Sequence, residues 1–210
     1  GRIMTEGVVP RILEKQNPDG SFGDSALFYR DKYRGTVWTL LILAELGADG
    51  GDERIRKACS FLLEHSLEPA SGAFSFDSSK TTGAGLPGGV IPCLTGNLTW
   101  ALIRLGWLHD PRVQGAIGWI CRWQRADDGD GEAPEGELYA KRRACWGKHS
   151  CHMGVAKCLK ALAAIPEAER SPEIRAKIGE FAEYFLKHHL YKKSHDSAQV
   201  SKPGWLKLGF

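Results

Sequence analysis

Four side chains suited to metal binding or nucleophilic chemistry fall within eight residues, Cys145, His149, Cys151 and His152. Thiolate and imidazole are the ligands that zinc prefers, and catalytic zinc sites use three protein ligands and leave one position open. Cys145, Cys151 and His152 are therefore candidate zinc ligands, and His149, Cys151 and His152 are candidate catalytic residues. A bound zinc would supply an activated thiolate or a metal-bound water, with His149 as the base.

The same segment also permits two interpretations without a metal. In the first, Cys151 and His152 line the packed start of a helix, and His149 bonds a backbone carbonyl. In the second, the segment is a polar site that binds no metal. A motif of this kind is a hypothesis until geometry supports it, so the three interpretations stay open.

An apolar pattern with helical spacing indicates the helices that must position this segment. Its three copies are Ile55, Ala58, Cys59, Leu62 and Leu63; Val113, Ala116, Ile117, Ile120 and Cys121; and Ile174, Ile178, Phe181, Ala182 and Phe185; Val9, Ile12 and Leu13 suggest a partial fourth. Each full copy follows a more apolar helix, expected at 36–46, 94–105 and 151–165, after a turn rich in glycine or proline. The pattern predicts an all-α fold of about three and a half antiparallel helical hairpins, with shielded inner and striped outer helices.

Length, composition and charge limit the classes of protein to which this chain can belong. With 210 residues, the chain is expected to form one domain over 1–210. A net charge of +3 is too small to favour nucleic acid as the partner. No apolar run is long enough to span a membrane, no signal peptide is evident, and Cys59 and Cys121 occupy apolar helix positions. We therefore expect a soluble, cytoplasmic protein and not an integral membrane protein.

The segment Gln16-Asn17-Pro18-Asp19-Gly20-Ser21-Phe22 resembles the glutamine-rich turn repeat of squalene and hopene cyclases and of protein prenyltransferase β subunits; a degraded copy occupies 124–129. The resemblance implies an α/α toroid, in which outer helices surround inner helices and a central cavity holds an isoprenoid substrate. Because the chain has fewer hairpins than a complete toroid, it is expected to be an arc, part of a longer ring, or a homo-oligomer.

The chain also departs from the pattern of the families that it resembles. The Asp-x-Asp-Asp motif with which these cyclases protonate their substrate is absent, and the nearest acidic cluster, 127–132, is typical of a solvated turn. The Gly-Cys-Gly-Glu-Gln segment of the complement-type toroids is absent too. Cys145 with Cys151-His152 resembles the zinc ligands of lanthipeptide cyclases in residue type but not in spacing.

Tryptophans at 38, 100, 119, 123, 146 and 205 either line a cavity or pack in the core. Three functional hypotheses remain. The first is a prenyltransferase or terpenoid cyclase-like protein that binds or acts on an isoprenoid-type molecule. The second is a helical-repeat scaffold without catalysis, and the third is zinc-dependent thiol chemistry on a peptide.

Overall fold

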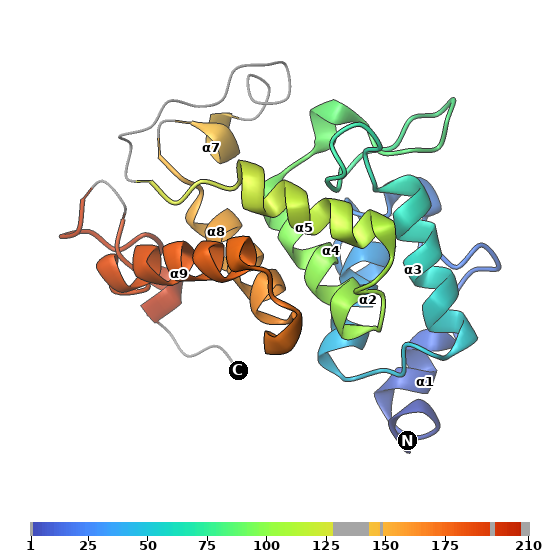
Figure 1. The fold of residues 1–210 in the computed structure, drawn as a ribbon. Helices are drawn as coiled ribbons and strands as arrows, with labels where there is room; N and C mark the ends of the chain where they lie inside the picture. Colours follow the sequence, from blue (N-terminus) through green and yellow to red (C-terminus); the bar gives the residue numbers. More distant parts are fainter. Residues whose placement is uncertain (1, 128–142, 148, 194–195, 207–210) are drawn as a thin grey trace.

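The structure, a computed structural model, describes residues 2–127, 143–147, 149–193 and 196–206 (Figure 1). Regular structure within these ranges is helical, and the only β-type pairings there are isolated bridges such as that between Gln16 and Phe22. The all-α prediction is therefore confirmed. None of the described helices combines the length and the apolar character needed to cross a bilayer.

The longer helices alternate between two sets along the chain. The first set is α2 (Thr36–Glu45), α4 (Pro92–Arg104) and α8 (His152–Ala163), and the second is α3 (Glu53–His65), α5 (Pro111–Trp123) and α9 (Pro172–Lys187). The shorter helices are α1 (Val8–Leu13) and α7 (Arg143–Trp146), with 3₁₀ turns at Arg2–Met4, Ser25–Leu27, Lys32–Arg34, Pro87–Gly89, Glu167–Glu169 and Pro203–Leu206. Helix α4 packs against both α2 and α8, and each member of the first set packs against the helix that follows it in the second.

Side-chain caps fix where the second set begins. The carboxylate of Asp52 accepts a hydrogen bond from the backbone N–H of Arg54 at 2.9 Å, and Asp110 does the same for Arg112 at 2.9 Å. Each carboxylate also pairs with the guanidinium of that arginine, whose hydrogen bond lowers the carboxylate pKa. Ser171 caps α9 through its hydroxyl. These caps satisfy backbone donors that the first turn of a helix leaves unpaired.

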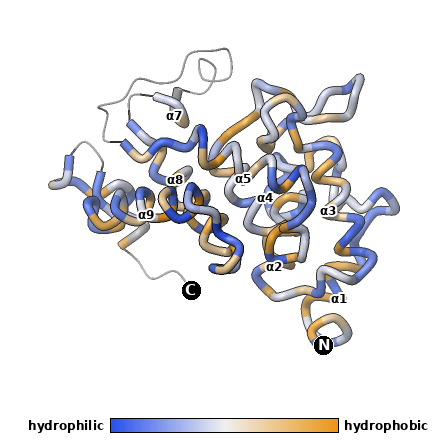
Figure 2. Tube along the Cα trace, viewed as in Figure 1, coloured by the Kyte–Doolittle hydropathy of each residue, from blue (hydrophilic) through white to orange (hydrophobic). Residues whose placement is uncertain are grey.

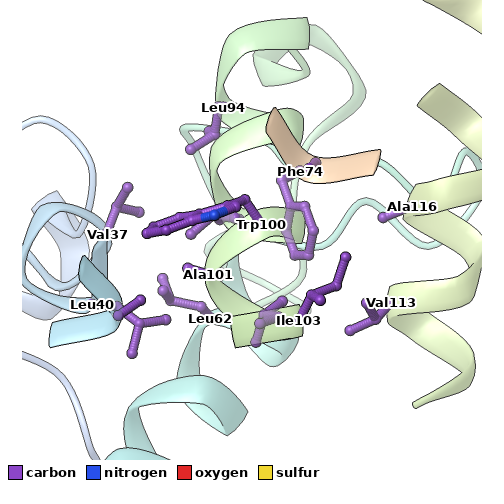
Figure 3. Close-up of a cluster of buried hydrophobic side chains, with 14 of the residues drawn as sticks. Val37, Leu40, Leu62, Phe74, Leu94, Trp100, Ala101, Ile103, Val113 and Ala116 are labelled. Carbon is purple, nitrogen blue, oxygen red and sulfur yellow. The ribbon is translucent and has the colours of Figure 1, made fainter. Parts of the chain in front are cut away.

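The predicted apolar stripes lie in the core for two of the three helices. All five stripe residues of α3 and all five of α5 are buried, whereas in α9 only Phe181 and Tyr184 are buried and Ile174 is partly exposed. Figure 2 shows the alternation of polar and apolar residues along these helices. In Figure 3, apolar side chains from α2, α4 and α5, among them Val37, Trp100 and Val113, converge on one cluster.

Helices α4 and α8 approach each other until their backbones touch. A Cβ added at Gly96 would lie 2.5 Å from the carbonyl carbon of Lys157 and 2.6 Å from the nitrogen of Cys158. One turn earlier, a Cβ at Gly154 would lie 3.0 Å from that of Pro92. Because residues near the start of α4 face residues near the start of α8, the two helices run parallel, with their N-termini at the same end.

The variant Gly96→Ala tests this contact. The added methyl group has no space, so we expect the free energy of unfolding to fall by about 1–3 kcal/mol, the usual cost of overpacking. Gly118→Ala is the matched control, because a Cβ at this exposed position of α5 meets nothing within 4 Å. That variant should gain about 0.5–1 kcal/mol from its better helix propensity. Urea denaturation measures both, and equal stability of the two variants would contradict the close contact.

Candidate functional site

Two of the predicted residues, Cys145 and Cys151, meet at the N-terminus of α8. Cys151 is the N-cap residue of α8, and its side chain lies beside the thiol of Cys145. The interaction with Cys145 and the nearby backbone N–H groups of Gly154 and Met153 lower the pKa of Cys151 to about 6, against the opposing effect of burial. The lowered pKa favours the thiolate of Cys151, which is the nucleophilic form of cysteine.

The segments that carry these cysteines are anchored on both sides. Trp146, beside Cys145, is 2% exposed and packs edge-on against Trp119 of α5, with ring centroids 5.6 Å apart. Ser150, beside Cys151, is buried, and its hydroxyl accepts a hydrogen bond from the backbone N–H of Asp127 at 2.9 Å. The sulfur pair is thus held by α5 and by the chain that follows it.

Two residues that sequence reasoning left out, Cys93 and Tyr29, belong to the same group. Cys93 lies in the first turn of α4 and interacts electrostatically with Cys151; burial, and then that interaction, raise its pKa to about 11. The pKa of Tyr29 is raised by burial and by the negative charges of Cys93 and Cys145. The available signal was that Cys93 and Cys151 stand at equivalent places, each at the start of a more apolar helix.

The two predicted histidines occupy different surroundings. His152 Nε2 lies 2.9 Å from the backbone oxygen of Leu190, and its ring packs edge-on against Phe185 at 4.7 Å between centroids. Burial lowers the pKa of His152. This imidazole is therefore directed to the C-terminal end of α9. His149 is half-buried in the segment between α7 and α8.

These positions bear on the predicted zinc site. The structure brings Cys145 and Cys151 together, but the contacts of His152 with Leu190 and Phe185 occupy its ring. Within the described ranges, no three His, Cys, Asp or Glu side chains are arranged to hold a metal ion. Zinc binding by Cys145, Cys151 and His152 stays a prediction.

An aromatic pocket of about 270 Å³ is lined mainly by residues of α2, α4 and α8. Its lining is Tyr33, Trp38, Leu41, Ile42, Glu45, Leu46, Asn97, Trp100, Lys157 and Lys160. The Lys160 ammonium lies 3.5 Å from the centroid of the Trp100 ring and forms an ion pair with Glu45. The pocket therefore combines an apolar aromatic wall with two lysines and one glutamate, and Lys160 is paired with that glutamate.

The sulfur group and the pocket adjoin. Cys93 and Asn97 are one turn apart on α4, and the charge of Lys157 acts on Cys93. Tyr29, which interacts with Cys93, also contacts Trp38, with ring centroids 6.0 Å apart, and its carbonyl accepts a bond from the Trp38 indole at 3.0 Å. The sulfur group and the aromatic pocket are therefore neighbours, connected through α4 and Tyr29.

The remaining sequence predictions divide clearly. Trp38 and Trp100 line the pocket, whereas Trp119 and Trp146 are core residues. The acidic residues at 128–132 and the side chain of Trp205 lie outside the described residues.

No protein-family model matches the sequence, and no curated protein matches it at a significant level. The resemblance to toroid enzymes therefore stays a prediction.

The pH dependence of alkylation tests the state of Cys151. With iodoacetamide, we expect the alkylation rate of Cys151 to reach half its maximum near pH 6, because the thiolate is the reactive form. In Cys145→Ala the midpoint should move toward the ordinary value of 9.0, whereas Cys145→Ser, which keeps a donor, should retain most of the lowering. Peptide mass spectrometry follows each cysteine separately. A wild-type midpoint near that of an ordinary thiol would contradict the lowered pKa of Cys151.

Proposed function

We propose that this chain is an arc of an α/α toroid of the terpenoid cyclase and prenyltransferase type, and that its aromatic pocket binds an isoprenoid-type molecule. The observation that carries the proposal is the pocket itself, with Trp38 and Trp100 in its wall and Lys157 and Lys160 at its edge. An apolar chain with an anionic head would match both parts of this lining.

The helix arrangement supports the toroid part of the proposal. Phe22 donates its backbone N–H to the hydroxyl of Thr36 at 3.0 Å, and Phe74 donates to Thr95 at 3.1 Å. Thr36 and Thr95 occupy the first turns of α2 and α4, so the same contact joins two successive turns to two successive helices of the first set. Repetition of one unit with its own internal contacts is what a helical repeat requires.

The chemistry of the pocket supports the isoprenoid part. The face of Trp100 already accepts the ammonium of Lys160, which demonstrates that this ring can stabilise a positive charge. Lys157 supplies positive charge for a diphosphate-type group, and Lys160, which is paired with Glu45, lies beside it on the same helix. Because the sequence lacks the Asp-x-Asp-Asp motif, we propose binding and assign no proton-transfer step to the pocket.

A scaffold without a small-molecule ligand is the alternative. Extraction of the purified protein with organic solvent, followed by mass spectrometry, separates the two. A stoichiometric isoprenoid in the extract supports the pocket as a binding site, and an empty extract favours the scaffold.

Titration with farnesyl diphosphate gives a sharper prediction. In calorimetry, Trp38→Ala should weaken binding by about tenfold or more, equivalent to roughly 1.4 kcal/mol, because the ligand loses an aromatic wall. Trp107→Ala is the matched control, since Trp107 is also a partly buried indole but lines a different pocket, near Arg104 and Asp110. Inorganic diphosphate alone should bind more weakly than the isoprenoid. Absence of farnesyl diphosphate binding, or equal losses in both variants, would overturn the proposal.

A second candidate function, zinc-dependent thiol chemistry on a peptide, is favoured by the neighbouring pair Cys145 and Cys151. Thiolates are preferred zinc ligands, so this pair would supply two of them. Elemental analysis tests the idea directly. Zinc in the wild-type protein and in Cys121→Ala, with loss of zinc in Cys151→Ala, would support it, and wild-type protein without zinc would reject it.

A further inference from the structure

A second pocket, which we call the turn pocket, lies where the turn from α2 to α3 meets the turn from α4 to α5. Its volume is about 560 Å³, and it shares no lining residue with the aromatic pocket. The charged and aromatic side chains that line it are Asp49, Arg56, Arg104, Trp107, His109 and Asp110. The volume lies within the range of roughly 300–1,000 Å³ that is usual for small-molecule sites.

Backbone packing holds the two turns together. A Cβ added at Gly50, in the first turn, would overlap the carbonyl oxygen of Leu105, the C-cap residue of α4. Arg56 projects from the first turns of α3, and Arg104 is the last residue of α4. The two arginines therefore stand on helices that this backbone contact fixes side by side, and both of them are exposed to solvent.

The carboxylates of the turn pocket already have partners, whereas its two guanidinium groups have none. Asp110 caps α5 and pairs with Arg112 at 2.8 Å, and Asp49 accepts the backbone N–H of Gly51 at 2.9 Å. Among the described residues, neither Arg56 nor Arg104 forms an ion pair or a side-chain hydrogen bond. Positive charge in this pocket is therefore available to a ligand.

The next groove along the chain provides an internal comparison. It lies between the α4–α5 turn and the α8–α9 turn, has a volume of about 210 Å³, and shares His109 with the turn pocket. There, Glu169 lies 3.5 Å from Nε2 of His109, and Gln114 donates to the carbonyl of Leu108 at 2.6 Å. Arg56 follows the first stripe residue of its helix just as Gln114 does, but it has no such partner. One groove is thus closed by the protein's own polar contacts, and the other is not.

The lining indicates the class of ligand. A guanidinium group binds phosphate or carboxylate oxygens through a planar fork of N–H groups, and one such fork occupies both oxygens of a carboxylate. A phosphate monoester has three terminal oxygens and carries up to about two negative charges, so it can serve two arginines that come from different helices. Trp107 is half-buried in the same pocket and offers an indole surface for a planar ring.

We propose that the turn pocket binds a small phosphate monoester that carries a planar ring, of the nucleoside monophosphate type. Arg56 and Arg104 bind the phosphate, and the indole of Trp107 packs against the ring. This site uses neither the aromatic pocket nor the cysteines, so it is independent of the proposed function.

Titration calorimetry of the full chain with adenosine monophosphate tests the site. Arg56→Ala and Arg104→Ala should each weaken binding by about tenfold or more, because the phosphate loses a charged partner. Arg104→Lys should recover part of the loss, since it keeps the charge without the fork. Arg11→Ala is the matched control, because Arg11 is an exposed arginine of α1 outside the turn pocket, and it should bind as the wild type does.

Two smaller probes divide the ligand into its parts. Adenosine lacks the phosphate and inorganic phosphate lacks the ring, so each should bind about tenfold more weakly than adenosine monophosphate, or worse. Trp107→Ala should weaken the binding of adenosine monophosphate, whereas Trp38→Ala, which alters the aromatic pocket, should leave it unchanged. The two tryptophan variants therefore distinguish a failure of this proposal from a failure of the isoprenoid proposal.

Three results would refute the proposal: no binding of adenosine monophosphate by the wild type, equal losses in Arg104→Ala and Arg11→Ala, or inorganic phosphate binding as tightly as adenosine monophosphate. Circular dichroism checks that each variant folds. If Trp107→Ala does not fold, the arginine variants, whose side chains are exposed, decide the outcome together with the two smaller probes.

Discussion

The contact between α4 and α8 is the constraint on which the rest of this structure depends. Gly96 lets the two backbones approach to a distance that no Cβ would allow, and a Cβ at Gly154 would crowd the side chain of Pro92 at the start of α4. Since the helices run parallel, their N-termini lie at one end, and Cys93 of α4 comes within electrostatic reach of Cys151 at the start of α8. The next turns of the same helices contribute Asn97 and Lys157 to the aromatic pocket. One backbone contact therefore sets both parts of the candidate site.

The two parts differ in their chemistry but share their supports. Tyr29 contacts the tryptophan at position 38 in the pocket wall, and its pKa is raised by burial and by electrostatic interaction with Cys93 and Cys145. One residue therefore packs against the pocket wall and interacts with the sulfur group. The helix start at Cys151 stabilises negative charge, while Lys157 and Lys160 bring positive charge to the pocket, so the site is polarised along α8.

Much of the helical framework could be predicted from the sequence, because it depends on local regularities. The stripes that begin at Ile55 and Val113 repeat with helical spacing and are buried, and aspartates at 52 and 110 mark helix starts through caps that involve only neighbouring residues. The stripe that begins at Ile174 is less buried than its pattern suggested, since how deeply a stripe is covered depends on the elements packed over it. The toroid arrangement itself stays a proposal.

The site was harder to predict because it depends on contacts between distant segments. Cys151 and His152 are adjacent in sequence, but Cys151 is the extended N-cap residue and His152 is the first residue of α8, and the imidazole is directed to Leu190. Cys93 joins the group only through the α4–α8 contact, which no local sequence pattern predicts. Likewise, spacing alone could not separate Trp100, which borders the pocket, from Trp119, which packs in the core.

The α4–α8 contact is tested most directly by nuclear Overhauser spectroscopy. A cross-peak is expected between the α-protons of Gly96 and the amide proton of Cys158. Its absence, in spectra that resolve the internal cross-peaks of both helices, would contradict the close contact of α4 with α8.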